Sequence, residues 1–489
     1  MPQANLELLQ LLRDLRLAIN DEASSRIDRW RGSIEREAFA FSADNLAHYM
    51  AFRHHDLRGL QRELMRHGLS SLGRLESRVM MTLSCVEAAL GALLDGRPLP
   101  TGWPPSEDDF FRGEALLRTN TDALLGPASE HGAGRVLVTL SGAAARDPGF
   151  LLEIARRGAD VVRINCAHDD ADSWAAMIEN TRKAGDAVAR RIPVLMDIAG
   201  PKFRIGSVKR HAGERLMPGD CFRLVRDEML FDPDETIEAV CDPGDVLDHL
   251  AVGTEVAFDD GKLSGVVQSV AAGAVTITVQ RTQLRGFKMK PERGLTFPRA
   301  DLKLDPLTAN DLSDLDFVAR HADMIGFSFV QSADDIALMQ DELAKRRADW
   351  QRLGIVAKVE TALAVRNLPE IIVRAAGRQP FGVMIARGDL AVAIGFERLA
   401  EMQEEILWLC EAAHVPVIWA TQVLEEMVKS GLPTRGEMTD AAMAVRAECV
   451  MLNRGPNVGD AITALRGLQH RMMERQSKKT ARLRALRSW

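Results

Sequence analysis

The chain has 489 residues, of which 46% are hydrophobic and 27% are charged, so it carries enough apolar material for a large core and is not a disordered chain. Its 62 basic and 69 acidic residues give a net charge of -7, which argues against a nucleic-acid partner. The 6 cysteines form no C-x-x-C pair, so we expect reduced thiols and a cytoplasmic protein. We expect no membrane partner, because no apolar stretch reaches the roughly 20 residues that span a bilayer.

The N-terminal part of the chain is predicted to be helical. Apolar residues recur at helical spacing over 8–19, and further amphipathic segments follow at 46–65 and 75–94. The glycine-containing stretch 126–134 is typical of a linker. Residues 1–130 are therefore expected to form an N-terminal helical extension with its linker. These helices would pack on the rest of the protein, mediate oligomerisation or receive a signal, and the sequence does not choose between the three.

From residue 135 onward, short apolar strands alternate with amphipathic helices, a pattern typical of βαβ units and a parallel sheet. The predicted strands, about eight in number, begin at Arg135, Asp160, Pro193, Met324, Gly354, Gly382, Pro416 and Cys449. Helices are predicted between most of them, at 147–157, 333–347, 398–413 and 440–447. Eight such strands close a barrel, so the predicted fold class is α/β, a (β/α)8 TIM barrel.

The third predicted strand is followed by a different pattern. Segments 206–294 contain strand-like pieces, beginning near Phe222, Gly253 and Ala274, that are separated by glycine-rich turns. This pattern predicts a small antiparallel barrel, which we interpret as an all-β lid domain inserted after strand 3 that closes over substrate and excludes water. The expected domains are 1–130, 131–206 (first part of the barrel), 207–296 (lid) and 297–489 (second part of the barrel with a C-terminal helix).

Catalytic groups of such barrels lie at the carboxyl ends of the strands, and these positions are unusually charged here. Alternation along the fifth strand places Lys358 and Glu360 on the same side, and the sixth strand is followed by Gly388 and Asp389. Two carboxylates suit Mg²⁺, which leaves its other coordination positions to water and substrate oxygens. The alternative is a buried ion pair of Lys358 with Glu360 that only fixes the register of the barrel.

Further polar side chains follow the second, third and seventh strands. They are Arg163, Asn165, His168, Asp197, Lys202, Arg204 and Thr421. Because arginine grips phosphoryl groups bidentately, Arg163 and Arg204 are candidate phosphate ligands, although exposed solvated charges are the simpler interpretation of each one alone. Thr421 offers a hydroxyl that would relay a proton, or would only cap the next helix.

Six segments of the chain resemble one enzyme family. The runs VVRINCAH, DIAGPKFRIG, DDGKLSG, KVE, ARGDLAV and WATQVLEEMVKSGLPTRGEMTD, in this order, closely resemble pyruvate kinase over about residues 135–470. The long run 420–440 and the ARGD segment do not arise from generic barrel constraints. The resemblance implies a glycolytic kinase, a transferase whose substrates are phosphoenolpyruvate and ADP and whose products are pyruvate and ATP. It also implies a homo-oligomer.

The resemblance implies a role for each residue of the metal and substrate site. Lys358 corresponds to the lysine that steadies the transferring phosphoryl group and the enolate. Glu360 and Asp389 correspond to the ligands of Mg²⁺ or Mn²⁺. The backbone of Gly388 and Asp389 would receive the substrate carboxylate, and Thr421 would lie near the face on which the enolate is protonated.

The resemblance also assigns the residues of the second and third strands. Arg163 and Arg204 match arginines that contact phosphate, and Arg163 counts among the catalytic residues. His168 falls with Arg204 on the nucleotide side. Asn165 and Asp197 match members of the monovalent-cation site.

Two groups of departures from the family pattern alter these expectations. Family members that need K⁺ carry a serine at Ala167 and a glutamate at Lys202. Because the fixed ammonium group of Lys202 would substitute for the bound ion, we predict that K⁺ is not required. The turn 139–144 and the loop 451–456 also differ, and both belong to the nucleotide side. The chain ends about thirty-five residues after the eighth strand, so we expect no C-terminal regulatory domain.

Two alternatives to phosphoryl transfer therefore stay open. One is metal-dependent enolate chemistry on a 2-keto acid, of the decarboxylase or aldolase type, without a nucleotide. The other is a catalytically weak sensor of phosphoenolpyruvate whose N-terminal helices bind a protein partner.

Overall fold

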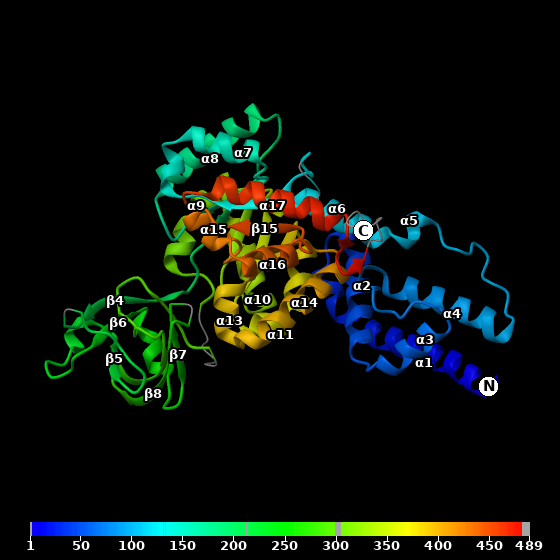
Figure 1. The fold of residues 1–489 in the computed structure, drawn as a ribbon, viewed down its shortest axis with the longest axis horizontal. Helices are drawn as coiled ribbons and strands as arrows, with labels where there is room; N and C mark the ends of the chain where they lie inside the picture. The colour runs from blue at the N-terminus through cyan, green and yellow to red at the C-terminus, as the bar shows by residue number, and fades with distance from the viewer. Residues whose placement is uncertain are drawn as a thin grey trace.

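The computed structural model describes residues 2–130, 132, 134–211, 213–259, 261–298 and 305–481. Its described residues form a central barrel, a group of N-terminal helices on one side of it, and a small barrel on the other side (Figure 1). The small barrel stands away from the central one and is joined to it by connections that follow β3 and β10.

Eight parallel strands close the central barrel in the order β1-β15-β14-β13-β12-β11-β3-β2. The (β/α)8 prediction and its eight strands are confirmed. Because all the strands run in one direction, the carboxyl ends that carry the candidate site residues share one rim of the barrel. The strands are β1 (Arg135–Thr139), β2 (Val161–Asn165), β3 (Val194–Asp197), β11 (Met324–Phe327), β12 (Gly354–Val359), β13 (Phe381–Ala386), β14 (Val417–Ala420) and β15 (Cys449–Leu452).

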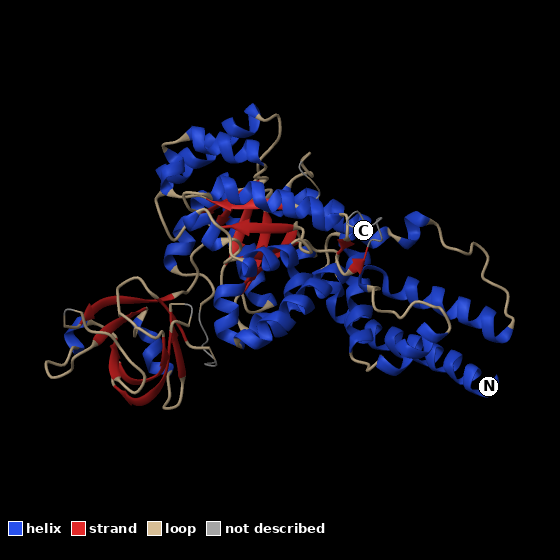
Figure 2. Cartoon of the chain, viewed as in Figure 1, coloured by secondary structure: helices blue, strands red, loops and turns tan. Residues whose placement is uncertain are grey.

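Helices surround this sheet (Figure 2). They are α7 (Pro148–Arg157), α8 (Ala171–Ala187), α9 (Ala309–His321), α10 (Ala333–Arg346), α11 (Ala362–Arg366), α12 (Leu368–Ala376), α13 (Arg387–Ile394), α14 (Phe396–Ala412), α15 (Glu425–Ser430), α16 (Arg435–Ala444) and α17 (Val458–Met473). The predicted start of a helix at residue 440 is wrong, because Thr434 and Glu437 form a capping box that starts α16 five residues earlier. A short hairpin of β16 (Gln476–Ser477) and β17 (Thr480–Ala481) follows α17.

The amino-terminal end of the barrel is closed by an apolar side chain from the preceding helix. Leu124, near the end of α6 (Arg112–Leu125), belongs to the cluster that fills the barrel interior. A Cβ atom added to Gly354 or to Gly382 would lie 2.5 Å from the nearest Leu124 methyl carbon. These two glycines therefore leave the space that Leu124 occupies.

The N-terminal helices are α1 (Pro2–Trp30), α2 (Glu37–Arg53), α3 (Arg58–Arg66), α4 (Val79–Asp95), α5 (Glu107–Phe110) and α6. The single helix predicted over 46–65 is wrong: the chain leaves helical geometry after Arg53, and a second helix begins at Arg58. The Asp56 carboxylate accepts a hydrogen bond from the backbone N–H of Arg58, which satisfies a free donor at the start of the second helix.

The N-terminal helices pack on the barrel through buried polar contacts. The two ring nitrogens of His414, which follows the end of α14 by two residues, lie 2.9 Å from the Ser42 hydroxyl and 3.0 Å from the Ser77 carbonyl oxygen. Burial lowers the pKa of His414 to about 4. The Asn45 amide also donates to the Ala412 carbonyl at 2.8 Å. The helices and the outer layer of the barrel share one apolar core. Of the three roles considered for the helices, namely packing on the barrel, oligomerisation and receipt of a signal, the structure therefore shows the first.

One stretch contradicts the expectation about membrane-spanning segments. Of the described residues, Glu76–Asp95 is helical, long and apolar enough to cross a membrane by length and composition. Within it, Leu83 and Leu90 are fully buried, and α4 packs against α1 and α2. Within the most apolar window of this segment, 39% is buried, and core helices that span no membrane pass the same test of length and composition.

The small barrel contains seven strands in the closed order β10-β4-β6-β5-β9-β8-β7 around its own apolar core. The pairing of β5 with β6 is parallel, so the expectation of a wholly antiparallel barrel is wrong for this pair. Strand β4 crosses the domain boundary expected after residue 206, because it begins at Phe203. The strands are β4 (Phe203–Lys209), β5 (Cys221–Val225), β6 (Glu238–Asp242), β7 (Glu255–Phe258), β8 (Leu263–Ala271), β9 (Ala274–Thr282) and β10 (Gly294–Thr296).

Candidate active site

Lys358 is the centre of a buried polar network at the carboxyl rim of the barrel. Its Nζ atom donates a 2.8 Å hydrogen bond to the Ser328 hydroxyl and lies 3.4 Å from Asp197 and 3.1 Å from Glu360. Burial disfavours the charged amine, but Asp197 and Glu360 outweigh that effect and raise the pKa of Lys358. The network therefore holds a fixed positive charge at the mouth of the barrel.

Glu360 points toward the same network from the end of β12. One of its oxygens accepts a 2.7 Å hydrogen bond from the backbone N–H of Phe329, which has a positive φ of 55° just after β11. Burial raises the pKa of Glu360, and the nearby carboxylate of Asp389 acts in the same direction, against the opposing effect of Lys358. A cation beside Glu360 would favour its ionised form.

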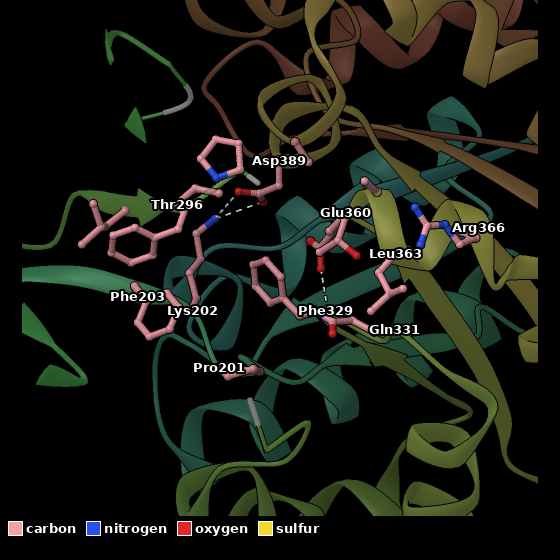
Figure 3. A pocket seen from close by; sticks show the side chains of 16 residues that line it. Pro201, Lys202, Phe203, Thr296, Phe329, Gln331, Glu360, Leu363, Arg366 and Asp389 are labelled. Carbon is pink, nitrogen blue, oxygen red and sulfur yellow. Dashed lines mark hydrogen bonds and ion pairs between the residues drawn. The ribbon is translucent and has the colours of Figure 1, made fainter. Parts of the chain in front are cut away.

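Asp389 faces Lys202 across the gap between the two barrels, as Figure 3 shows. The Lys202 ammonium group lies 3.0 and 3.1 Å from the two carboxylate oxygens of Asp389. Lys202 was expected in the monovalent-cation site with Asn165 and Asp197. It lines the same cavity as Asn165 and Ala167, but its ion pair is with Asp389.

Arg163 is anchored by Asp197 at the end of the neighbouring strand. Its Nε donates to Asp197 Oδ2 at 2.8 Å, a second guanidinium nitrogen bonds the same oxygen, and a third lies 3.2 Å from the Thr139 hydroxyl. Burial alone would raise the pKa of Asp197, but Arg163 and Lys358 lower it below its usual value. Asp197 therefore stays ionised and orients two cations. Asn165 lies beside Asp197 in the register of β2 and β3.

Thr421 follows β14 in a left-handed conformation, with φ of 64°. Its hydroxyl oxygen accepts a 3.0 Å hydrogen bond from the backbone N–H of Gly388, at the start of α13. This differs from the expectation that the Gly388 N–H faces the substrate. The N–H of Asp389, the next in that helical turn, is the other donor that was expected to receive the substrate carboxylate.

The part of the rim where the nucleotide is expected to bind carries several cations around His168. Burial lowers the pKa of His168, and the charges of Arg454 and Arg204 lower it further. Arg454 lies in the loop after β15, where the sequence departs from the family pattern, and it is exposed. This corner is therefore electropositive, and its histidine is neutral near pH 7.

A cavity of about 180 Å³ gathers most of the candidate residues. A larger one of about 370 Å³ adjoins it between the two barrels and shares Lys202, Glu360 and Asp389 with it (Figure 3). Outside the smaller cavity, Asp197 lies behind Arg163 and Lys358, and Gly388 lies behind Thr421. The candidate residues that line the smaller cavity are Arg163, Asn165, Lys202, Arg204, Lys358, Glu360, Asp389 and Thr421.

The donor set fits a divalent cation that takes few protein ligands. Glu360 and Asp389 line both cavities, and the described residues contain no group of three or more histidine, cysteine, aspartate or glutamate side chains that could hold a metal. Two carboxylates with water and substrate oxygens are the coordination that Mg²⁺ commonly adopts.

Three residues that contact the candidate site residues escaped the sequence analysis. Ser328 contacts both Lys358 and Asp197, Phe329 offers its backbone N–H to Glu360, and the Arg387 side chain crosses the end of β14. Ser328 stands at the carboxyl end of a barrel strand, so the same positional rule that selects Lys358 would have selected it.

Comparison with known proteins gives a consistent result. Residues 133–460 match the family described as "Pyruvate kinase, barrel domain". The chain is 31% identical to the pyruvate kinase of Thermococcus litoralis over 328 residues, which are 66% of each chain. It is 32% identical to that of Methylorubrum extorquens over 360 residues (73% of this chain, 68% of the relative). It is 31% identical to that of Geobacillus stearothermophilus over 322 residues (65% and 52%). The matches thus span about half to two thirds of the relatives' own length.

Proposed function

The chain belongs to the pyruvate kinase family, and on that premise we propose that it transfers the phosphoryl group of phosphoenolpyruvate to ADP, giving pyruvate and ATP. The observation that carries the proposal is the convergence of Lys358, Glu360 and Asp389 at one cavity on the carboxyl rim of the barrel. A cation and two carboxylates at this place fit an oxyanion that is bound through a metal.

Glu360 and Asp389 would hold Mg²⁺, which supplies positive charge to the enolpyruvate oxygens when it is bound. Lys358 then contributes a second positive charge whose position is fixed by Ser328 and Asp197. Because Asp197 also anchors Arg163, the ammonium and guanidinium groups would be preorganised around the migrating phosphoryl group. Most of the rate enhancement would come from positioning and electrostatics.

The carboxylate of the substrate would bind at the amino-terminal end of α13. The backbone N–H of Asp389 and the positive end of the helix dipole supply attraction there. The N–H of Gly388 is engaged by the Thr421 hydroxyl, so we assign Gly388 to holding Thr421 in place. Thr421 would supply the proton that converts the enolate to pyruvate.

ADP would bind on the side of the rim where the positive charges of Arg204 and Arg454 surround His168. Arginine side chains bind phosphate groups through bidentate hydrogen bonds. The small barrel, connected at both ends near this rim, would act as the lid that excludes water during transfer.

The direct test is the formation of pyruvate from phosphoenolpyruvate in the presence of Mg²⁺, with and without ADP. The proposal predicts pyruvate only when ADP is present, together with one ATP for each pyruvate. The result that would overturn it is no pyruvate at saturating concentrations of both substrates.

One observation favours a second candidate, enolate chemistry without a nucleotide. The turn after β1 forms a 3-10 helix, Gly142–Ala145, in which Ala144 is fully buried, so this part of the nucleotide side offers few side-chain donors. Consumption of oxaloacetate with Mg²⁺ and no nucleotide would support this candidate. The same experiment should show no such consumption if phosphoryl transfer is the only activity.

A further inference from the structure

Arg387 is a buried arginine beside the candidate active site, and neither the metal nor the phosphate assignment uses it. It is 7% exposed, and its Nε donates a 3.0 Å hydrogen bond to the carbonyl oxygen of Ala420. Its two terminal nitrogens bond the carbonyl oxygen of Thr421 and the carboxylate of Asp440 in α16. The guanidinium carbon also lies 5.1 Å from the ring centre of Trp419. Two of the three guanidinium nitrogens are therefore committed to the segment around Thr421, and the third is tied to Asp440 in α16.

That segment has an uncommon backbone conformation. Thr421 and Gln422 have φ angles of 64° and 56°, and Leu424 follows with 49°. Left-handed geometry is unfavourable for non-glycine residues, and most of all for a β-branched residue such as threonine. Such a conformation persists when surrounding contacts impose it. The hydrogen bonds from Arg387 to two successive carbonyl groups, those of Ala420 and Thr421, are contacts of this kind.

The conformation decides which way the Thr421 hydroxyl can act. Its oxygen accepts the hydrogen bond from the Gly388 N–H at 3.0 Å. A hydroxyl has a single hydrogen, and a bond that it accepts leaves that hydrogen available for donation. Because Thr421 lines the cavity with Lys358 and Glu360, the free hydrogen is available to a group bound there.

We propose that Arg387 is a positioning residue that holds Thr421 in the geometry from which its hydroxyl protonates the enolate. This inference rests on the proposed function. In the step, the C=C electron pair of the enolate forms a new C–H bond with the hydroxyl proton, and the enolate oxygen becomes the ketone of pyruvate. Thr421 then regains a proton from solvent water. Arg387 touches neither substrate nor metal in this scheme and acts through the backbone of Thr421.

The first measurement follows the proton directly. Exchange of the pyruvate methyl hydrogens for deuterium, monitored by proton NMR with Mg²⁺ and ATP, reports the reverse of the protonation step. Arg387→Met should slow this exchange by about 100-fold, the cost typical of a misplaced acid–base group. The dissociation constant of oxalate should change by less than about threefold, because the metal and its carboxylates are untouched. Arg387→Lys keeps the charge but loses the planar guanidinium group. Its exchange rate should lie between the rates of the wild type and of Arg387→Met.

A double-mutant cycle separates positioning from general damage. In a Thr421→Ala background, Arg387→Met should cause almost no further loss of exchange, since both substitutions remove the same proton transfer. Arg466→Met is the matched control. Arg466 is equally buried, and it bonds the carbonyl groups of Gly134 and Gly158 at the opposite end of the barrel. Its loss should lower stability and leave exchange per folded molecule unchanged.

A crystal structure of the Arg387→Met protein provides the readout that does not need activity. We expect Thr421 to leave the left-handed region and its hydroxyl to lose the hydrogen bond from Gly388. If Thr421 keeps its φ and that bond, the inference is overturned whatever the protein catalyses. The inference would also be overturned if Arg387→Met slowed exchange by the same factor in the wild-type background and in the Thr421→Ala background. A wild-type protein that neither exchanges pyruvate hydrogens nor forms pyruvate refutes the proposed function, while the crystal structure still decides the role of Arg387.

Discussion

The Lys202 ammonium group lies 3.0 Å from one carboxylate oxygen of Asp389 and 3.1 Å from the other, and 5.9 Å from the ring centre of Phe329. Lys202 belongs to the connection between β3 and β4, whereas Asp389 belongs to α13. The chain thus supplies its own monovalent positive charge to the cavity that the candidate metal ligands line.

The first prediction concerns monovalent cations. Turnover of phosphoenolpyruvate should be the same in K⁺ as in tetramethylammonium, because Lys202 provides the charge. Lys202→Gln should lower turnover by at least about 10-fold. This is less than the roughly 10²–10³-fold loss that is typical when one preorganised donor is removed. K⁺ should not restore it, since Ala167 and Ile198 offer no side-chain oxygen in that corner. A wild-type rate that rises tenfold when K⁺ replaces tetramethylammonium would contradict the prediction.

The second prediction concerns the central lysine. Lys358→Met should reduce the rate of pyruvate formation by about 10²–10³ or more, because it removes a fixed charge from the transition state. Circular dichroism should show the same secondary structure, since Arg163 still pairs with Asp197. The rate of Lys358→Arg, which keeps the positive charge, should be compared with that of Lys358→Met. Near wild-type turnover by the methionine variant would show that Lys358 has no part in the reaction.

The third prediction tests the nucleotide side. Arg454→Met should raise the KM for ADP by roughly 10-fold and leave the KM for phosphoenolpyruvate unchanged, as expected for loss of one charge-assisted phosphate contact. Arg118→Met is the matched control, because Arg118 is also an exposed arginine but lies at the opposite end of the barrel. Equal effects of the two substitutions on the KM for ADP would argue against a role for Arg454.

The fourth prediction concerns pH and the docked N-terminal helices. Burial lowers the pKa of His414 from 6.5 to about 4, so between these values the unfolded chain binds a proton that the folded chain does not. The contribution of neutral His414 to stability is therefore complete above pH 6.5 and falls by roughly 3 kcal/mol as the pH drops to 4. Relative to the wild type, His414→Gln should remove this loss in denaturant unfolding curves.

Comparison with the variant is needed because Glu411, in the last turn of α14 and three residues before His414, has the opposite effect on stability. Burial raises the pKa of Glu411 from 4.5 to about 7, so its contribution to stability is complete below pH 4.5 and is lost as the pH rises to 7. The wild-type curve contains both effects. If wild type and His414→Gln lose equal stability between pH 6.5 and pH 4, His414 is not the group responsible.

The strands of the central barrel were predictable because each is an apolar run with turn residues on both sides, as in the run that begins at Met324. The location of the polar residues at the carboxyl rim was predictable too, because the position of Lys358 or Asp197 at the end of a strand places it at that rim. Helix ends were less certain. The capping box of Thr434 and Glu437 was readable in the sequence, but the break before Arg58 interrupts an apolar pattern that continues across it.

Contacts between distant segments could not be predicted from local patterns. The parallel pairing of β5 with β6 and the reach of Lys202 to Asp389 both depend on how separate elements meet in space. The Gly388 N–H illustrates the same limit: its place on the rim follows from the strand pattern, but its bond to Thr421 depends on the left-handed turn after β14. Two backbone carbonyl groups of that turn, those of Ala420 and Thr421, accept hydrogen bonds from Arg387, a contact between segments that are far apart in the sequence.

We expect Glu360 and Asp389 to bind one divalent cation beside Lys358. Binding of Mn²⁺ with oxalate, measured by electron paramagnetic resonance, tests it without any need for turnover. We expect one Mn²⁺ per wild-type chain, and Glu360→Gln or Asp389→Asn should each weaken binding by about 100-fold or more, beyond the 10–100-fold typical of outer partners. Glu342→Gln, on the outer helix α10, should have no effect. Mn²⁺ binding that is unchanged in both site variants would contradict the account.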